Sequence, residues 1–439
     1  MIKRRRVPKI YFGWWMNLVT GIVSGLGLGF NNYGISAMFK SISADLNLDR
    51  AGTSLASGIA RLESGLEAPL TGWLSDRFGP KWVIVTGLFI ICIGLAFMNF
   101  IEAPWSYYLV WGVAVGIGSN LANTIAIDKA LANWFIRKRG LALGIRFVIL
   151  GICGVIVIPV VTWLLGIHGW RTTCLIWAGV IFIGIPLSWY FVKQKRPEYY
   201  GLLPDGVEVE ADAGSDIDAM IDKGIEYAAG LEEVEFTIRQ ALRTPAFWLI
   251  TLSWICMMPI NGGFNIHCIP FLTDRGIDET VAAGMMAMMI FFTVPARFIG
   301  GILSDRIRKD RHAFLIAGAF LIQALGITTF LLHQSTATMY VMLILFGFGS
   351  GAPVPIRLTM GGRYFGRKSF ASIQGIMSMC SAPLSFFAPI YAGWIYDNHG
   401  SYIPAFITYA ILATVATMLM CLVRPPKSPP KVTGIRDLF

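Results

Sequence analysis

Charged residues are scarce in this sequence, and their scarcity excludes most soluble proteins. Only 14% of its 439 residues are Asp, Glu, Lys or Arg, whereas 55% are hydrophobic and the mean hydropathy is +0.62. Soluble globular domains carry about a quarter charged residues. The composition therefore indicates a protein embedded in a lipid bilayer.

The sequence also lacks the residue groupings of metal and catalytic centres. It has 5 histidines, and its 7 cysteines are scattered singly without the paired spacing of a metal site. No set of nucleophile, base and orienting residue stands out. We predict that the chain is not an enzyme and needs no cofactor.

Long apolar runs, by contrast, are abundant. Twelve such runs recur, each long enough to cross the ~30 Å hydrocarbon core of a bilayer as a helix. The first follows the basic N-terminus without a small-residue cleavage site, so we interpret it as a retained span and not as a signal peptide. The predicted fold class is an all-α polytopic membrane protein with twelve transmembrane helices.

The positive charges, which give the chain a net charge of +10, lie in every second loop between these runs. Because cytoplasmic loops carry the excess of Lys and Arg, this predicts a multi-pass protein of the inner (cytoplasmic) membrane with both termini in the cytoplasm. Basic clusters that spans keep apart do not form a face for nucleic acid, so no such partner is expected. The clusters lie at 3–6, 77–81, 137–139, 193–196, 306–311, 363–368 and 424–427.

Loop motifs repeat between the two halves of the chain at a nearly constant offset. The segment 72–77 recurs at 301–306, Trp134-Phe135 recurs as Tyr364-Phe365, and His168-Gly169 recurs as His399-Gly400. Spans 1 to 6 and 7 to 12 are therefore copies in the same orientation. The predicted domains are six-helix bundles over 1–195 and 243–425, an acidic cytoplasmic linker with a short surface helix over 196–242, and a tail over 426–439. The linker is either a solvated tether or a binding surface for a basic partner.

One of these loop motifs resembles the loop 2–3 signature of the major facilitator superfamily. Its members are Gly72, Asp76, Arg77, Gly79 and Lys81, and Gly301, Asp305 and Arg306 stand at the repeated positions. The resemblance implies the major facilitator fold of two parallel six-helix repeats. A small glycine lets helices approach, and the Asp–Arg pair forms charge contacts that break when the halves rock, so these residues form the predicted gating motif.

Further motifs resemble the monocarboxylate transporters and their bacterial oxalate/formate antiporter-like relatives. These motifs lie at 11–15, 134–144, 169–171, 196–206 and 267–276. The resemblance implies that Arg297 binds the carboxylate of the substrate. The sequence departs from that branch at Thr293, where an acidic residue is expected, and in span 1, which lacks the expected lysine.

Polar and ionisable side chains within the spans are candidate site residues because each is costly to bury in a bilayer. Arg297, Arg146, Lys129 and Glu67 each lie about 10 to 14 Å along a helix from the nearest cytoplasmic anchor. The positive charges outnumber the negative ones, which favours an anionic ligand. The predicted substrate-binding residues are Arg297, Arg146, Asn31, Asn32, Tyr33, Asn120, Asn123 and Arg357. Interhelical ion pairs and helix–helix hydrogen bonds are the alternative for the same residues.

A second group of titratable residues is predicted to couple protons or to form ion pairs. It comprises Glu63, Glu67, Arg61, Asp128, Lys129 and His267. A carboxyl group in a low dielectric is able to hold a proton near neutral pH, and His267 has the intrinsic pKa of a switch. Permanent pairing of the two glutamates with Arg61 and Arg146, and a loop role for His267, remain open.

Together these features predict a secondary active transporter of a small organic anion, a mono- or dicarboxylate, by proton-coupled symport and alternating access. Its partners are the anion, protons or a counter-anion, and the lipid bilayer. An exchanger of carboxylates and an exporter of hydrophobic, drug-like compounds are alternatives. The Gly-Pro signature expected of exporters in span 5 is missing between Gly151 and Pro159, which favours the carboxylate carrier.

Overall fold

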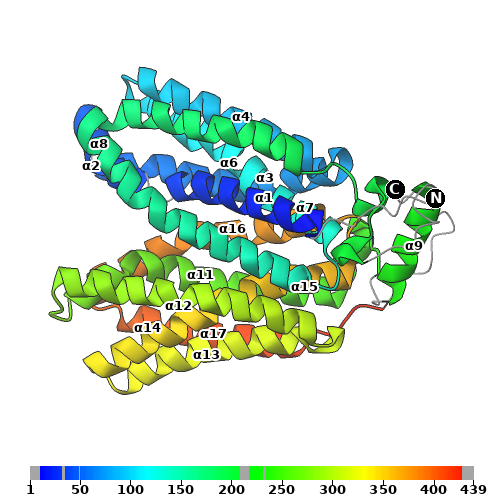
Figure 1. The fold of residues 1–439 in the computed structure, drawn as a ribbon. Coiled ribbons are helices and arrows are strands. Elements are labelled where there is room, and N and C mark those ends of the chain that lie inside the picture. Colours follow the sequence, from blue (N-terminus) through cyan, green and yellow to red (C-terminus); the bar gives the residue numbers. More distant parts are fainter. Residues whose placement is uncertain (1–9, 32–34, 49, 208–216, 231–233, 428–439) are drawn as a thin grey trace. The chain divides into compact units, whose positions relative to one another are not determined.

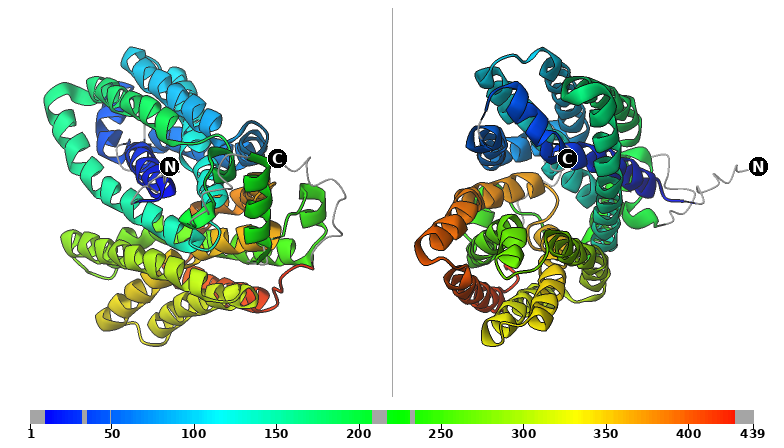
Figure 2. Two further views of the ribbon diagram at one scale, coloured as in Figure 1. Left: turned by 45° about the vertical axis from the view of Figure 1, so that its right-hand side comes forward. Right: turned by 90° about the vertical axis from the view of Figure 1, so that its left-hand side faces the viewer.

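The computed structural model describes residues 10–31, 35–48, 50–207, 217–230 and 234–427. Within these ranges the chain forms helices and no strand, which confirms the all-α prediction (Figure 1). Nine helical stretches there are long and apolar enough to cross a membrane. One of them, α8 (Arg139–Phe191), leaves helical geometry at Gly169, where φ is 72°, and so makes two spans. Figures 1 and 2 show α8 as two long arms joined at one end.

Two further helices complete the predicted set of twelve. These are α1 (Phe12–Gly29) and α3 (Arg50–Phe78). The remaining helices of the first repeat are α2 (Ile35–Asp45), α4 (Pro80–Phe97), α5 (Pro104–Tyr107), a π-helical turn (Tyr108–Val115), α6 (Gly116–Asn123) and α7 (Ile125–Trp134).

The linker and the second repeat are helical as well. Short 3-10 turns at Pro197–Tyr200 and Pro204–Gly206 follow α8. The linker then forms α9 (Ile217–Gly230), which the sequence did not predict, and α10 (Ile238–Leu242). The second repeat consists of α11 (Pro245–Thr273), α12 (Glu279–Arg306), α13 (His312–Leu332), α14 (Thr336–Gly351), α15 (Pro353–Phe365), α16 (Phe370–His399) and α17 (Ile403–Cys421).

The chain divides into two compact units whose boundaries differ from the sequence repeat. The first unit holds Met1–Glu235 together with Phe365–Met379, and the second holds Phe236–Tyr364 and Cys380–Asp437. The start of α16 therefore packs with the first repeat and the linker, although it belongs to the second repeat in sequence.

Small residues bring helices close together within each unit. In the first unit, a Cβ on Gly87 of α4 would lie 2.6 Å from the backbone nitrogen of Ala122 on α6. In the second, a Cβ on Gly351 of α14 would lie 2.5 Å from the carbonyl oxygen of Thr293 on α12. Such contacts replace hydrophobic burial as the force that associates helices in lipid.

The fourth span of each repeat is divided into two helices near its middle. Span 4 changes direction at Thr124, where φ is −126° and ψ is −96°, so that α6 and α7 are separate helices. Span 10 is divided between α14 and α15 at Ala352, which keeps helical angles (φ −58°, ψ −40°) before Pro353. A bend such as that at Thr124 frees backbone polar groups from the helix, and interrupted helices are typical of transport sites.

Candidate transport site and gate

The break in span 4 is held by a buried arginine. Arg146 of α8 is 1% exposed, forms an ion pair with Asp128 of α7, and donates from Nη2 to the carbonyl oxygen of Asn123 at 2.5 Å. That carbonyl lies at the end of α6, where the helix stops. The sequence left open which residues pair with Arg146 and Asp128. In the structure these two residues pair with each other between two helices, and not with the two glutamates.

Asn123 beside this break is fully buried. Its side chain lies against Gly27 of α1, whose Cβ would be 2.8 Å from Nδ2. Within the described part of the chain, neither Oδ1 nor Nδ2 forms a hydrogen bond. A buried amide with its hydrogen-bonding groups unused is the kind of group that receives a ligand or a water molecule.

Two carboxyl groups lie between α3 and α6 in the same unit. Glu63 and Glu67 are half-buried and lie one turn apart on α3. Thr71 donates to Glu67 Oε1 at 3.1 Å, while a Cβ on Gly116 would lie 2.5 Å from Glu63 Oε2. The structure thus brings the two predicted proton-coupling glutamates together on one helix interface.

The same helix interface contains a hydrogen bond between two neutral side chains. Ser64 donates to Asn120 Oδ1 at 2.8 Å, so α3 and α6 are also joined through the predicted ligand residue Asn120. Asn31 ends the first span half-buried. Asn32, Tyr33 and the side chain of Arg61 lie outside the described residues.

The second unit contains the two remaining candidate arginines. Arg297 lies on α12, one turn beyond Thr293, and is half-buried. Arg357 lies on α15, just after the break in span 10, with its guanidinium 4.5 Å from the ring centroid of Trp254 on α11. This stacking fixes the plane of a group that pairs with carboxylates through two parallel N–H bonds.

His267 lies elsewhere in the second unit. Its Nδ1 is 3.1 Å from the hydroxyl oxygen of Tyr402, between α11 and the turn before α17. His267 thus belongs to the second unit and the glutamate pair to the first.

The gating motif in α3 binds the start of α16, inside the first unit. Asp76 accepts hydrogen bonds from the backbone N–H groups of Ala371 at 3.3 Å and Ser372 at 2.8 Å. A Cβ on Gly72 would collide with the carbonyl oxygen of Ala371. A carboxylate at a helix N-terminus also interacts favourably with the helix dipole.

Lys129 of α7 completes this contact. Its Nζ lies 2.7 Å from Asp76 Oδ1 and donates to the carbonyl oxygens of Arg367 and, at 2.9 Å, Lys368. The structure therefore places Lys129 with the gating motif and not with the glutamates with which it was grouped.

The other motif residues have local roles. Arg77 lies 5.1 Å from the ring centroid of Trp73, Gly79 has a φ of 84°, and Lys81 lies 4.1 Å from the ring centroid of Trp189. In the second repeat, the carbonyl oxygens of Gly301 and Asp305 accept from Ser304 and Arg363, and Arg306 ends α12.

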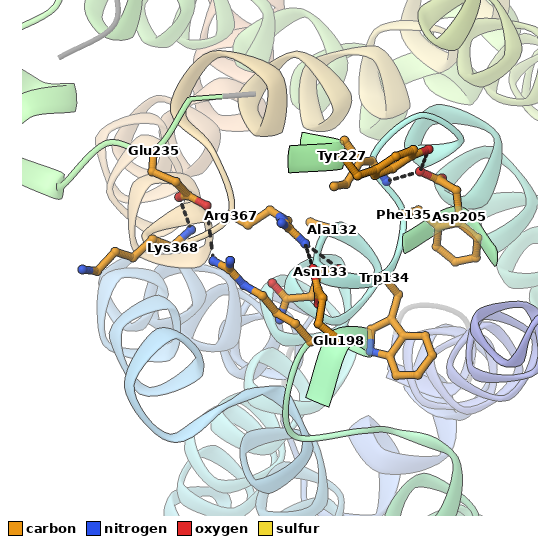
Figure 3. Close-up of polar contacts among 12 residues, drawn as sticks. Ala132, Asn133, Trp134, Phe135, Glu198, Asp205, Tyr227, Glu235, Arg367 and Lys368 are labelled. Carbon is orange, nitrogen blue, oxygen red and sulfur yellow. Dashed lines mark hydrogen bonds and ion pairs between the residues drawn. The ribbon is translucent and has the colours of Figure 1, made fainter. Parts of the chain in front are cut away.

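Sequence reasoning missed three acidic residues near the gate. Glu198, Asp205 and Glu235 of the linker contact the turns that precede α8 and α16 (Figure 3). The available signal for Glu198 and Asp205 was the segment 196–206, one of the motifs of the family resemblance.

Comparison with known proteins gives the family. The model of the Major Facilitator Superfamily matches residues 21–388 and 310–438, so the chain belongs to that superfamily and is a transporter, not an enzyme. Monocarboxylate transporter 13 of Rattus norvegicus is 23% identical over 93% of this chain and 88% of its own length.

Two solved structures share the fold. One is the proton:xylose symporter XylE bound to 6-bromo-6-deoxy-D-glucose, with a TM-score of 0.70 and 14% identity over 93% of this chain and 96% of that one. The other is the human organic anion transporter MFSD10, with a TM-score of 0.63 and 13% identity over 93% and 98% of the two chains.

Proposed function

We propose that this transporter is a secondary active carrier of a small organic anion, a mono- or dicarboxylate, that works by alternating access. The observation that carries the proposal is the pair of half-buried arginines on spans 8 and 10, of which Arg357, near the start of α15, stacks on Trp254. Arginine in a membrane span is costly unless it serves a ligand or an ion pair.

The chemistry of the two arginines suits a carboxylate. A guanidinium group presents N–H donors in a planar fork that matches the two oxygens of a carboxylate, and it stays charged at every physiological pH. Arg297 is proposed as the principal anchor and Arg357 as a second positive group. The names of the relative and of one structural neighbour, a monocarboxylate transporter and an organic anion transporter, support this substrate class.

The glutamate pair on α3 is the proposed coupling site. One proton shared between Glu63 and Glu67 removes the repulsion of two like charges, and Thr71 and Asn120 surround the pair with neutral polar groups. A carrier of this kind would take up the anion together with a proton. Exchange of one carboxylate for another, without a proton, is the second candidate mechanism.

The proposed orientation follows from the basic loops. With Lys and Arg concentrated in alternate loops, the positive-inside rule places the linker and both termini on the cytoplasmic side of an inner membrane. The gating motif and the start of α16 then lie at the cytoplasmic end.

The test is uptake of a panel of radiolabelled mono- and dicarboxylates into proteoliposomes, with and without an inward proton gradient. We expect gradient-dependent uptake by the wild type, loss of uptake in Arg297→Ala, and uptake that no longer responds to the gradient in Glu67→Gln. Arg311→Ala, which removes an exposed arginine, is the matched control and is expected to keep wild-type uptake. A folded wild type that carries none of the acids would refute the anion proposal.

A further inference from the structure

The linker places a carboxylate on backbone N–H groups of the corresponding turn in each repeat. Lys138 and Lys368 are equivalent residues, 230 positions apart, in the turns that precede α8 and α16. The N–H of Lys138 donates to Asp205 Oδ1 at 2.8 Å, and the N–H of Lys368 donates to Glu235 Oε2 at 2.7 Å. Figure 3 shows Asp205 and Glu235 at the two ends of this group of contacts, all within the first unit.

Several hydrogen-bond donors contact the carboxylate of Asp205. Asp205 is 5% exposed and its Oδ2 also accepts from the N–H groups of Ile136 at 3.2 Å and Arg137 at 2.8 Å. The hydroxyl of Tyr227 on α9 donates to the same oxygen at 3.0 Å. Burial and the charge of Asp205 raise the pKa of Tyr227, so the phenol keeps its proton and remains a donor.

The Glu235 end is bound by fewer donors. Besides the N–H of Lys368, Glu235 accepts from Arg196 Nη2 at 3.2 Å. A side chain at position 366 would collide with the carbonyl oxygen of Val234. Gly366, with a φ of 81°, lets the two backbone segments lie this close. This contact therefore depends on two hydrogen bonds and on one glycine.

A buried ion pair lies beside the Glu235 contact. Arg367 Nη1 is 3.4 Å from Glu198 Oε1 and donates to the carbonyl oxygen of Asn133 at 3.2 Å. Helix α9 packs over Glu198, since a Cβ on Gly224 would lie 2.6 Å from its Oε1. Glu198 is consequently only 1% exposed.

We propose that residues 196–207, 217–230, 234 and 235 form a clip with one fixed end and one releasable end. Asp205 fixes the clip to the turn between α7 and α8. Glu198 and Glu235 form a latch on residues 366–368, and the latch opens when the start of α16 leaves Asp76 during the transport cycle. Both groups of contacts are needed because rocking of the repeats separates helix ends that belong to different repeats. The inference depends on the family membership and not on which anion is carried.

The test is the chemical accessibility of Ser372, which is 3% exposed while Asp76 holds its N–H. Ser372→Cys is introduced into the full-length chain after replacement of its 7 native cysteines, and alkylation by a maleimide is timed in detergent. We expect Glu198→Gln and Glu235→Gln each to raise the labelling rate about tenfold, because each removes charge from the latch. Glu226→Gln removes the same charge from the exposed side of α9 and is expected to leave the rate unchanged.

Two results would overturn the proposal. One is a labelling rate in Glu235→Gln equal to that in Glu226→Gln. The other is an equal increase in all three variants, which would show that linker charge and not the latch controls access. If Glu198→Gln does not fold, Glu235→Gln decides alone, because its side chain is partly exposed and its loss is tolerated more easily.

Discussion

The turns before α8 and α16 are equivalent in sequence but are held differently. Asp205 receives three backbone N–H groups and a phenol at the first turn, whereas Glu235 receives one backbone N–H group and one guanidinium at the second. The linker emerges directly from α8, so its first residues stay with the first repeat. Its last residues lead into the second repeat, which begins with α11. In the proposed clip, one unrepeated segment therefore holds the turn before α8 permanently and the turn before α16 only while the gate is closed.

The largest loss of stability is expected from a change at Asp205, the fixed end of the clip. Asp205→Ala would leave three N–H groups and the Tyr227 hydroxyl without their acceptor in a buried turn. We expect a loss of about 4 kcal/mol in stability, seen as a lower melting temperature and a low yield of monodisperse protein. Asp222→Ala on the exposed side of α9 is the control. A melting temperature equal to that of the control would contradict the anchoring role.

The next largest loss of stability is expected when the buried ion pair between Glu198 and Arg367 is broken. Glu198→Gln keeps the shape of the side chain but removes the counter-charge of Arg367, which costs about 3 kcal/mol when the pair is buried. Thermal unfolding of this variant beside Glu226→Gln measures the loss. Equal unfolding temperatures for the two variants would show that the ion pair does not stabilise the folded protein.

A smaller change in stability is expected at the releasable end. Glu235→Gln weakens one charge-assisted hydrogen bond and should lower the stability by about 1 kcal/mol. Uptake of the transported anion by this variant should still occur, because Glu235 lies at the gate and not among the proposed ligand residues. Complete loss of uptake by the folded variant would show that Glu235 does more than hold the turn before α16.

The smallest effect is expected from the phenol. Tyr227→Phe removes one of the four donors to Asp205 and leaves the three backbone donors in place. We expect a loss of about 0.5 to 1 kcal/mol, measured by thermal unfolding beside Tyr190→Phe, a change at an exposed tyrosine of α8. A loss as large as that of Asp205→Ala would mean that α9, and not the turn, is the main partner of Asp205.

The sequence was sufficient for the spans and the repeat, because both depend on local signals. Apolar runs marked the twelve helices, and the constant offset between loop motifs marked the two halves. Asp76 and Gly72 of the motif contact the start of α16, and their role in gating stays a prediction.

Tertiary contacts were not predictable in the same way. Span 4 breaks at Thr124 without a proline, and the pairing of Arg146 with Asp128 joins two helices. Helix α9 escaped prediction because its acidic face and Gly224 resemble a tether, while its position depends on Glu198 and Asp205 of the preceding turns. Lys129 looked like a deep charge, and only the fold shows that it meets residues 367 and 368.

The most direct measurement of the difference between the two turns is hydrogen–deuterium exchange of the wild-type chain. We predict that the amides of Ile136, Arg137 and Lys138 exchange much more slowly than those of Lys368, Ala371 and Ser372, because the latter lose their acceptors each time the gate opens. Equal protection of the two equivalent turns, or faster exchange before α8, would contradict a clip with one fixed and one releasable end.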